Sequence, residues 1–178
     1  MHAQDIVVAL AIRLVKPPQP SWNYPLLSAF TSLSVSQCHV ACRGLMEARL
    51  MRQDDGEPWS VSARNLAEFM VHGLPYWLPA KVGPTTRGIP TGRSAAFVAA
   101  ELGEIADGEV TVWPWRDGTV RGNAVSPIHA CQLRCCEKPG AERLHQALVL
   151  ADLIRIGGDK DRSWAKDRLA ALLKQPPA

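Results

Sequence analysis

The hydrophobic pattern of the first fifty residues predicts a series of short helices separated by connectors. Residues 5–15 are apolar on nearly every face, so we expect a short helix that is buried on all sides. Prolines within the segment 16–20 end this helix. Asn23, a favourable N-cap residue, and Pro25 in the first turn then predict a second helix that runs to about Thr31.

The third helix has the clearest start signal. Ser34, followed three residues later by Gln37, forms a capping box, and the helix is expected to end near Ala48. Residues 52–59, centred on the run Asp54-Asp55-Gly56, predict a tight turn that two very short strands could flank. The first third of the chain therefore consists of helices followed by a small acidic loop.

The middle of the chain changes from a helical to an irregular pattern. Leu66, Phe69 and Met70 lie at helical spacing and predict a helix over residues 62–72. Residues 73–92 are rich in proline, glycine and threonine, which indicates a long loop or a domain boundary.

A β-hairpin and two long helices are expected in the C-terminal part. Strand patterns at 109–113 and 119–125 flank a turn at 114–118. A helix then runs from Pro139-Gly140 to about Ile156, where two glycines end it, and a last helix covers about residues 160–173. The apolar positions that we expect in the core or in a dimer interface are Leu144, Leu148, Ala151 and Ile154 in the first helix and Trp164, Leu169 and Leu172 in the second.

Composition and charge narrow the class of protein. The 178 residues are 47% hydrophobic and 21% charged, which is ordinary for a globular protein and excludes a disordered or fibrous chain. The net charge of +3 arises entirely in residues 1–52, which hold five basic and two acidic side chains. A nucleic-acid partner is therefore expected first in this part of the chain.

The sequence also bears on the compartment. The apolar run 6–15 is too short to span a bilayer, contains Arg13 and has neither a basic leader nor a small-residue cleavage site. The five cysteines follow no regular framework, which fits free thiols in a reducing compartment. We therefore expect a cytoplasmic protein without a membrane partner.

Residues 24–51 have the pattern of a helix-turn-helix, in which the second helix presents its N-terminal half to the major groove. Ser32 takes the tight-turn position, Leu33 the buried turn position and Ser34 the cap. The expected inner face of the second helix comprises Cys38, Ala41, Cys42 and Leu45. The expected outer face comprises Ser36, Gln37, His39, Val40, Arg43 and Gly44. Of these, Ser36, Gln37, His39 and Arg43 can hydrogen-bond to bases or phosphates.

Residues 32–39 (SLSVSQCH) and 45–51 (LMEARLM) closely resemble the recognition helix and the following strand of winged-helix regulators of the MarR-like kind. The resemblance covers about the first 60 residues and implies a DNA-binding module. Val40 stands where those regulators usually have a basic residue, Gly44 where they often have another, and Arg49 replaces their usual glycine. The phosphate contacts are therefore expected to be fewer than in the family.

The charge of the loop after this helix is a second difference from the winged-helix regulators. Its acidic residues, Asp54, Asp55 and Glu57, would repel phosphate if they pointed toward it. We therefore expect modest affinity in each subunit and a gain in affinity from dimerisation.

A weaker resemblance extends over residues 64–173. It rests on residues 66–79, 83–91, 113–114, 121–122, 153–158 and 166–169, which are similar to a family of uncharacterised bacterial helix-turn-helix proteins without an established activity. The resemblance implies a two-part regulator, which could be encoded beside a toxin-like partner.

These patterns together predict an α+β fold with a winged helix-turn-helix at residues 1–60 and a linking helix at 61–79. Residues 80–178 would form a mixed region, with the β-hairpin and two C-terminal helices, that dimerises or binds a partner. The predicted function is a sequence-specific transcriptional regulator, an autoregulating repressor that binds double-stranded DNA as a homodimer and is not an enzyme. The predicted DNA-binding residues are Ser34, Ser36, Gln37, His39, Val40, Arg43, Arg49 and Arg52, and no cofactor or metal is expected. The alternative is a protein-interaction module, such as an antitoxin or adaptor subunit, whose winged unit contacts a protein partner.

Two patterns suggest ligand sites in the C-terminal part. The run 85–88 (TTRG) could offer backbone amides and a guanidinium to an anion, although a structural loop is the preferred interpretation. His129 with Cys131, Cys135 and Cys136 could suggest zinc, but paired C-x-x-C motifs are missing, so buried or reduced thiols are preferred.

Two further groups leave a choice between function and structure. His145 and Asp152, near Arg155, could form a catalytic constellation, although solvated side chains on an amphipathic helix are preferred. The aromatic residues Tyr76, Trp77, Trp113 and Trp115 could form a binding platform or belong to the core, and the sequence leaves both open.

Overall fold

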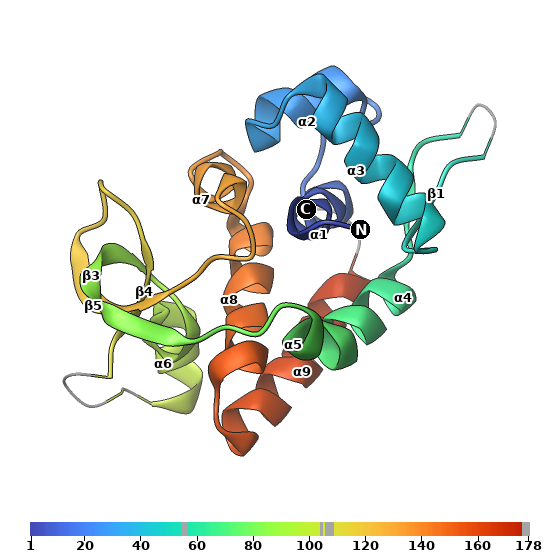
Figure 1. Ribbon diagram of the computed structural model, residues 1–178. Coiled ribbons are helices and arrows are strands. Elements are labelled where there is room, and N and C mark those ends of the chain that lie inside the picture. Colours follow the sequence, from blue (N-terminus) through green and yellow to red (C-terminus); the bar gives the residue numbers. More distant parts are fainter. Residues whose placement is uncertain (55–56, 104, 106–108, 176–178) are drawn as a thin grey trace.

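A computed structural model of the chain describes residues 1–54, 57–103, 105 and 109–175, and shows a mixed α+β protein (Figure 1). Buried apolar residues from Ile6 near the N-terminus to Leu173 near the C-terminus form one continuous core. The predicted division of the chain after residues 60 and 79 stays a prediction.

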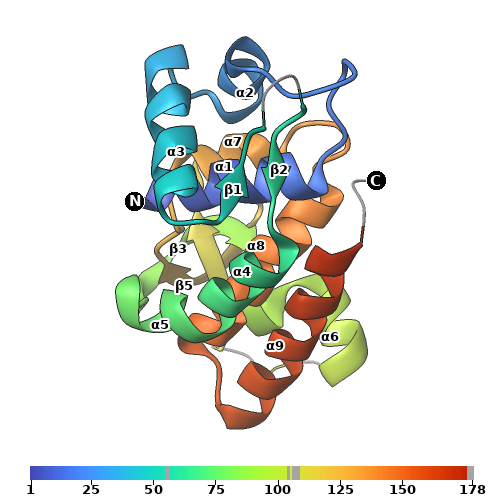
Figure 2. The same cartoon turned by 90° about the vertical axis from the view of Figure 1, so that its right-hand side faces the viewer.

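Helix α1 (Ala3–Leu14) lies across the middle of the molecule (Figures 1 and 2). It packs against α3 (Val35–Glu47) on one side and α8 (Glu142–Ile156) on the other. Its residues 6–11 are fully buried, which confirms the expectation from its apolar pattern. The helix begins earlier than predicted, so that Asp5 lies within its first turn.

Local signals place α2 (Tyr24–Thr31) and α3 as the sequence predicts. The Asn23 side chain accepts a hydrogen bond from the Leu26 amide at 2.9 Å. Ser32 takes a left-handed conformation with φ 58°, which makes the sharp turn between the helices. The Ser34 hydroxyl accepts from the Gln37 amide at 3.1 Å, and the Gln37 side chain accepts from the Ser34 amide at 2.9 Å.

Two very short strands follow α3, as expected. Strands β1 (Met51–Arg52) and β2 (Ser60–Val61) pair antiparallel, with Met51 opposite Val61 and Arg52 opposite Ser60. The predicted centre of the loop, at residues 55 and 56, lies outside the described residues.

The next helical stretch is longer than predicted. It comprises α4 (Ala63–Glu68), a π-helical turn (Phe69–Gly73) and α5 (Leu74–Trp77). The expectation of a long loop at 73–92 is wrong, because α5 and the nine-residue strand β3 (Val82–Pro90) occupy much of this segment, and the alternative of a domain boundary stays a prediction.

The prediction of a loop at residues 73–92 failed because the glycines of this segment allow strands to pack closely. A Cβ atom at Gly88 would lie 1.9 Å from the Trp113 carbonyl oxygen, so only glycine lets the two backbones pass this closely. The preferred interpretation of residues 85–88 as a structural loop is wrong for the same reason, since they lie inside β3.

Strands β4 (Thr111–Pro114) and β5 (Val120–Val125) lie near their predicted positions, but the predicted hairpin is wrong. Both strands pair antiparallel with β3, and their contact with each other is parallel, so the three form a small closed barrel. The chain after β4 stays on β3, where the Trp115 amide donates to the Arg87 carbonyl at 3.1 Å. The sequence pattern predicted β4 and β5 but not β3, the strand with which both of them pair.

Helices cover the barrel and close the core. The helices α8 and α9 (Asp159–Lys174) were predicted and pack on each other, whereas α6 (Ala96–Leu102) and α7 (Cys131–Cys136) were not predicted. In α9 the buried residues are Ala165, Leu169 and Leu173, so the prediction is confirmed at Leu169, whereas Trp164 and Leu172 are only partly buried against the core. Within the described part of the chain, none of the helices has the length and apolarity needed to cross a membrane.

Candidate nucleic-acid interface

Helix α3 has one buried and one exposed face. Cys38, Ala41, Cys42 and Leu45 are fully buried, as predicted for the inner face. The exposed residues of the helix that were predicted to contact DNA are Ser36, Gln37, His39, Val40 and Arg43. Val40, which stands where a basic residue was expected from the resemblance, has 48% of its surface exposed.

Gly44 is not an outer-face residue, which corrects the predicted face. A Cβ atom at Gly44 would lie 3.0 Å from Oδ2 of Asp5, so glycine lets α1 approach α3 closely at this point. Asp5 itself is fully buried, and its Oδ2 accepts a hydrogen bond from the His2 amide at 2.6 Å. Its Oδ1 has no partner among the described residues. Burial raises the pKa of Asp5, although the His2 amide and nearby histidines act against this effect.

An aromatic row connects α2, α3 and the strand segment. The Tyr24 ring lies 5.1 Å from the His39 ring and 4.7 Å from the Trp59 ring. Burial raises the pKa of the Tyr24 hydroxyl, an effect that the positive charge of Arg43 opposes. His39 is therefore held against Tyr24 while the residue as a whole stays exposed.

Arg49 ends α3 in an unusual conformation for an arginine. Its φ is 56°, in the left-handed region that favours glycine. Glycine is also the usual residue at this position in the winged-helix regulators that the segment resembles. The Asn65 side chain donates to the Arg49 carbonyl at 2.8 Å and fixes this turn. Arg49, Arg52 and Asn65 border a hollow of about 620 Å³ at the base of β1 and β2.

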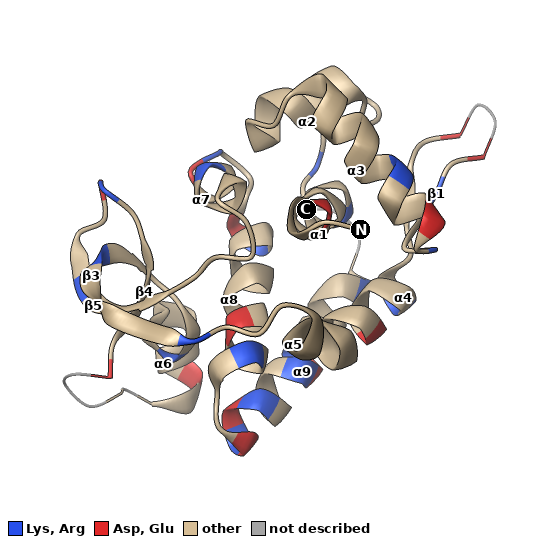
Figure 3. Cartoon of the chain, in the orientation of Figure 1, with Lys and Arg blue, Asp and Glu red and all other residues tan. Residues whose placement is uncertain are grey.

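The charges of this side of the molecule are mixed (Figure 3). Arg43, Arg49 and Arg52 are exposed, and among the described residues none of them forms an ion pair. The exposed acidic residues Glu47, Asp54 and Glu57 lie on the same elements, at the end of α3 and around the β1–β2 loop. The surface is therefore basic only at separate points.

A second hollow, of about 420 Å³, lies at the N-terminal half of α3. Ser36, Gln37 and Val40 border it from α3 and His129 from the segment before α7. The start of α1 closes the remaining side. No local sequence pattern indicates that His129 lies beside α3, because His129 is far from α3 in the chain.

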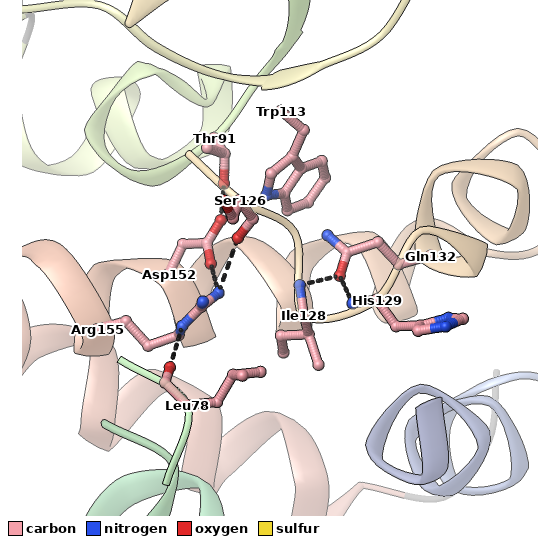
Figure 4. A network of polar contacts seen from close by, with 9 residues as sticks. All are labelled: Leu78, Thr91, Trp113, Ser126, Ile128, His129, Gln132, Asp152 and Arg155. Atoms are coloured by element: carbon pink, nitrogen blue, oxygen red, sulfur yellow. Dashed lines mark hydrogen bonds and ion pairs between the residues drawn. The ribbon is translucent and has the colours of Figure 1, made fainter. Parts of the chain in front are cut away.

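Asp152 and Arg155, which the sequence suggested as a possible catalytic constellation with His145, belong to a buried structural network (Figure 4). The preferred interpretation of them as solvated side chains is therefore wrong. Asp152 is fully buried and accepts hydrogen bonds from Thr91 at 2.8 Å and Trp113 at 2.5 Å. It also pairs with Arg155 at 2.8 Å. Burial raises the pKa of Asp152, and the Arg155 charge and the hydrogen bonds oppose this effect.

Arg155 connects the network to two more segments. Its guanidinium donates to the Leu78 carbonyl at 2.9 Å and to the Ser126 carbonyl at 3.2 Å. His145 lies elsewhere on α8, with its ring 5.5 Å from Trp113, and burial lowers its pKa. The network therefore joins the barrel, α5 and α8, and His145 does not complete a catalytic triad with it.

The cysteines are free thiols, most of them buried. Burial raises the pKa of Cys42 and of Cys136 to about 12. A hydrogen bond with Cys135, together with burial, raises the pKa of Cys131. Across the residues that the structure describes, three or more His, Cys, Asp or Glu side chains do not come together in a way that could hold a metal ion.

The four aromatic residues are not one platform. Trp113 is fully buried, whereas 87% of the Tyr76 surface is exposed. Trp77 packs on Phe69 with ring centroids 5.7 Å apart, and Trp115 donates from its ring nitrogen to Glu137 at 3.0 Å.

Comparisons of the chain with protein-family models, with curated proteins and with solved structures find no match.

Proposed function

We propose that the chain is a sequence-specific DNA-binding regulator in which α1–α3 with β1 and β2 act as a winged helix-turn-helix. The observation that carries the proposal is the orientation of α3. Its inner face is fully buried, and its N-terminal half exposes polar side chains to solvent. A helix held in this way has the shape and the hydrogen-bonding groups to enter the major groove.

The exposed side chains suggest a division of roles. Ser36 and Gln37 would reach base edges, and the exposed Val40 would contact a thymine methyl group. Arg43 would contact a phosphate or a guanine. Arg49 and Arg52, beside the hollow at the base of β1 and β2, would hold the DNA backbone.

The proposed assembly is a dimeric repressor. Glu47, Asp54 and Glu57 reduce the attraction of one subunit for phosphate. Two subunits on adjacent half-sites would restore the affinity by binding together. We propose that the target is the chain's own upstream DNA, so that the protein represses its own synthesis.

The test is binding of the purified chain to its own upstream duplex and to a scrambled duplex, across a salt series. Wild-type protein should prefer the upstream duplex and lose affinity as salt rises. Arg43→Ala should weaken binding and reduce the slope of log K against log salt by about 0.9 for each lost phosphate contact. Lys160→Ala, which removes an exposed charge from the start of α9, is the matched control and should leave the slope unchanged.

Absence of binding at low salt would refute the role of α3, and an Arg43→Ala variant with both the affinity and the salt slope of wild type would refute the role of Arg43. The second candidate is a protein-interaction module whose winged unit contacts a protein partner, and the exposed apolar side chain of Val40 on α3, with 48% of its surface exposed, favours it. Weaker association with a protein partner in Val40→Asp, together with absence of DNA binding, would support the second candidate.

A further inference from the structure

The barrel carries a second basic surface, on another side of the molecule from α3 (Figures 1 and 3). Arg87 of β3 and Arg121 of β5 are directly opposite each other in the strand register. Directly opposite residues project from the same face of a sheet, with Cβ atoms about 5 Å apart. Both arginines are exposed, and among the described residues neither has a carboxylate partner.

Two like charges in directly opposite positions destabilise a sheet when nothing lies between them. The backbone nevertheless fixes this arrangement. A Cβ atom at Gly88 would overlap the Trp113 carbonyl, and one at Gly118 would lie 2.4 Å from Gly88, so the strands and the turn after β4 pack backbone to backbone here. This packing leaves the strand register, and with it the arginine pair, little freedom to change.

A hollow of about 570 Å³ adjoins Arg87, and Arg121 does not border it but is the residue directly opposite Arg87 on the next strand. Its volume lies in the range of small-molecule sites. It is bordered by Thr86, Arg87, Pro114, Trp115 and Arg116. Trp115 is held in place because its amide donates to the Arg87 carbonyl and its ring nitrogen donates to Glu137 at 3.0 Å. Arg116 adds a third guanidinium, although Asp117 pairs with it at 3.2 Å.

We propose that this hollow binds a nucleoside phosphate. The guanidinium groups of Arg87 and Arg121 would hold the phosphate, because paired guanidiniums match its oxygens and its charge. The fixed indole of Trp115 would offer a face on which the base stacks. The ligand would also neutralise the opposed arginines, so binding should stabilise the fold. This site is separate from α3 and does not depend on its function.

The phosphate could belong to a free nucleotide or to a single-stranded nucleic acid, and the probes distinguish the two. The full chain is titrated with ATP that carries a fluorescent ribose label and with fluorescein-labelled 15-nucleotide oligo(dT) and oligo(U), followed by anisotropy. We expect at least one probe to bind, and Arg87→Ala and Arg121→Ala each to weaken its binding about tenfold or more. Binding of the oligonucleotides alone would assign the site to a strand, and binding of ATP alone to a free nucleotide.

Matched variants separate this site from structural effects. Trp115→Ala should weaken binding about tenfold, and Trp115→Phe should restore most of it, because stacking needs an aromatic face. Lys160→Ala, which removes an exposed charge from α9, should bind all probes like wild type. Without ligand, Arg121→Ala should melt at the same or a slightly higher temperature than wild type, because it removes the repulsion with Arg87.

Three results would overturn the proposal. The first is that none of the probes binds the wild-type chain at low salt. The second is that a probe binds the Arg87→Ala and Arg121→Ala variants as tightly as wild type. The third applies where labelled ATP binds, and is that inorganic phosphate displaces it as strongly as unlabelled ATP does, which would leave the base and Trp115 without a role.

Discussion

The α3 side and the barrel side of the molecule each contain a buried aspartate, but they hold it differently. Beside the barrel, Asp152 receives hydrogen bonds on both carboxylate oxygens, from Thr91, Trp113 and Arg155. Beneath α3, Asp5 accepts from the His2 amide, and its other oxygen has no partner in the described part of the chain. The carboxylate of Asp152 is therefore fully hydrogen-bonded, whereas the burial of the Asp5 carboxylate is not fully compensated.

The arginines of the two sides also differ in arrangement. Arg87 and Arg121 are held side by side by strand register. Arg43, Arg49 and Arg52 are distributed over a helix, a helix end and a strand, with acidic residues between them. A compact pair suits one phosphate group, whereas separated cations suit a long polyanion such as duplex DNA.

The largest effect that would test this comparison is expected at Asp152. Asp152→Ala leaves the guanidinium of Arg155, whose side chain is 1% exposed, without its anion. We expect the free energy of unfolding to fall by about 3–5 kcal/mol, because a buried charge then lacks compensation. Urea unfolding followed by circular dichroism measures the change.

The control for this prediction is a half-exposed ion pair of the same type. Arg93 and Asp161 lie 2.9 Å apart with 27% and 24% of their side chains exposed. Asp161→Ala should cost about 1 kcal/mol or less, since solvent screens the pair. Equal losses of unfolding free energy for Asp152→Ala and Asp161→Ala would show that the buried network stabilises the fold no more than a partly exposed ion pair does.

The sequence predicts the α3 side better than the barrel side for a physical reason. Capping residues act on their own helix, so Asn23, Ser34 and Gln37 locate α2 and α3 without knowledge of the rest of the fold. The register of β3 depends on contacts of Gly88 with residues that are far away in the chain. Local patterns do not contain such contacts, so the sequence suggested a loop and a hairpin in their place.

The candidate sites follow the same rule. The exposed face of α3 could be derived from helical periodicity, because the buried residues recur at helical spacing. Gly44 was misplaced because its neighbour, Asp5, belongs to another helix. The pairing of Arg87 with Arg121 could not be predicted, because it depends on the register of two strands that are far apart in the chain.

A smaller effect, of opposite sign, is expected at Asp5. Burial raises the pKa of Asp5 above its ordinary value of 3.8, so the folded state holds the proton more tightly than the unfolded state. Wild-type stability should therefore fall as the pH rises from the unfolded pKa through the folded pKa. Asp5→Asn keeps the acceptor for His2 and removes the charge, so it should gain about 1 kcal/mol at neutral pH.

The measurement is urea unfolding of both proteins from pH 3.5 to pH 6. The gain of Asp5→Asn over wild type should grow with pH in this range and vanish at its acidic end. Asp161→Asn, at a half-exposed site, is the control. A variant that is less stable than wild type at every pH would mean that the buried carboxylate is better compensated than its geometry indicates.

The smallest expected effect is at Arg49, where one substitution should change stability and DNA binding in opposite directions. Arg49 has φ 56°, a conformation that costs an arginine more than a glycine. Arg49→Gly should therefore raise the free energy of unfolding by about 0.5 kcal/mol, after the entropy that glycine adds to the unfolded chain is subtracted. The same change should weaken duplex binding and reduce its salt slope if Arg49 contacts phosphate. Arg52→Ala, on regular strand backbone, should reduce the salt slope without the gain in stability. If Arg49→Gly is more stable but binds duplex DNA like wild type, the DNA contact lies on α3 and β1, and Arg49 serves only to end the helix.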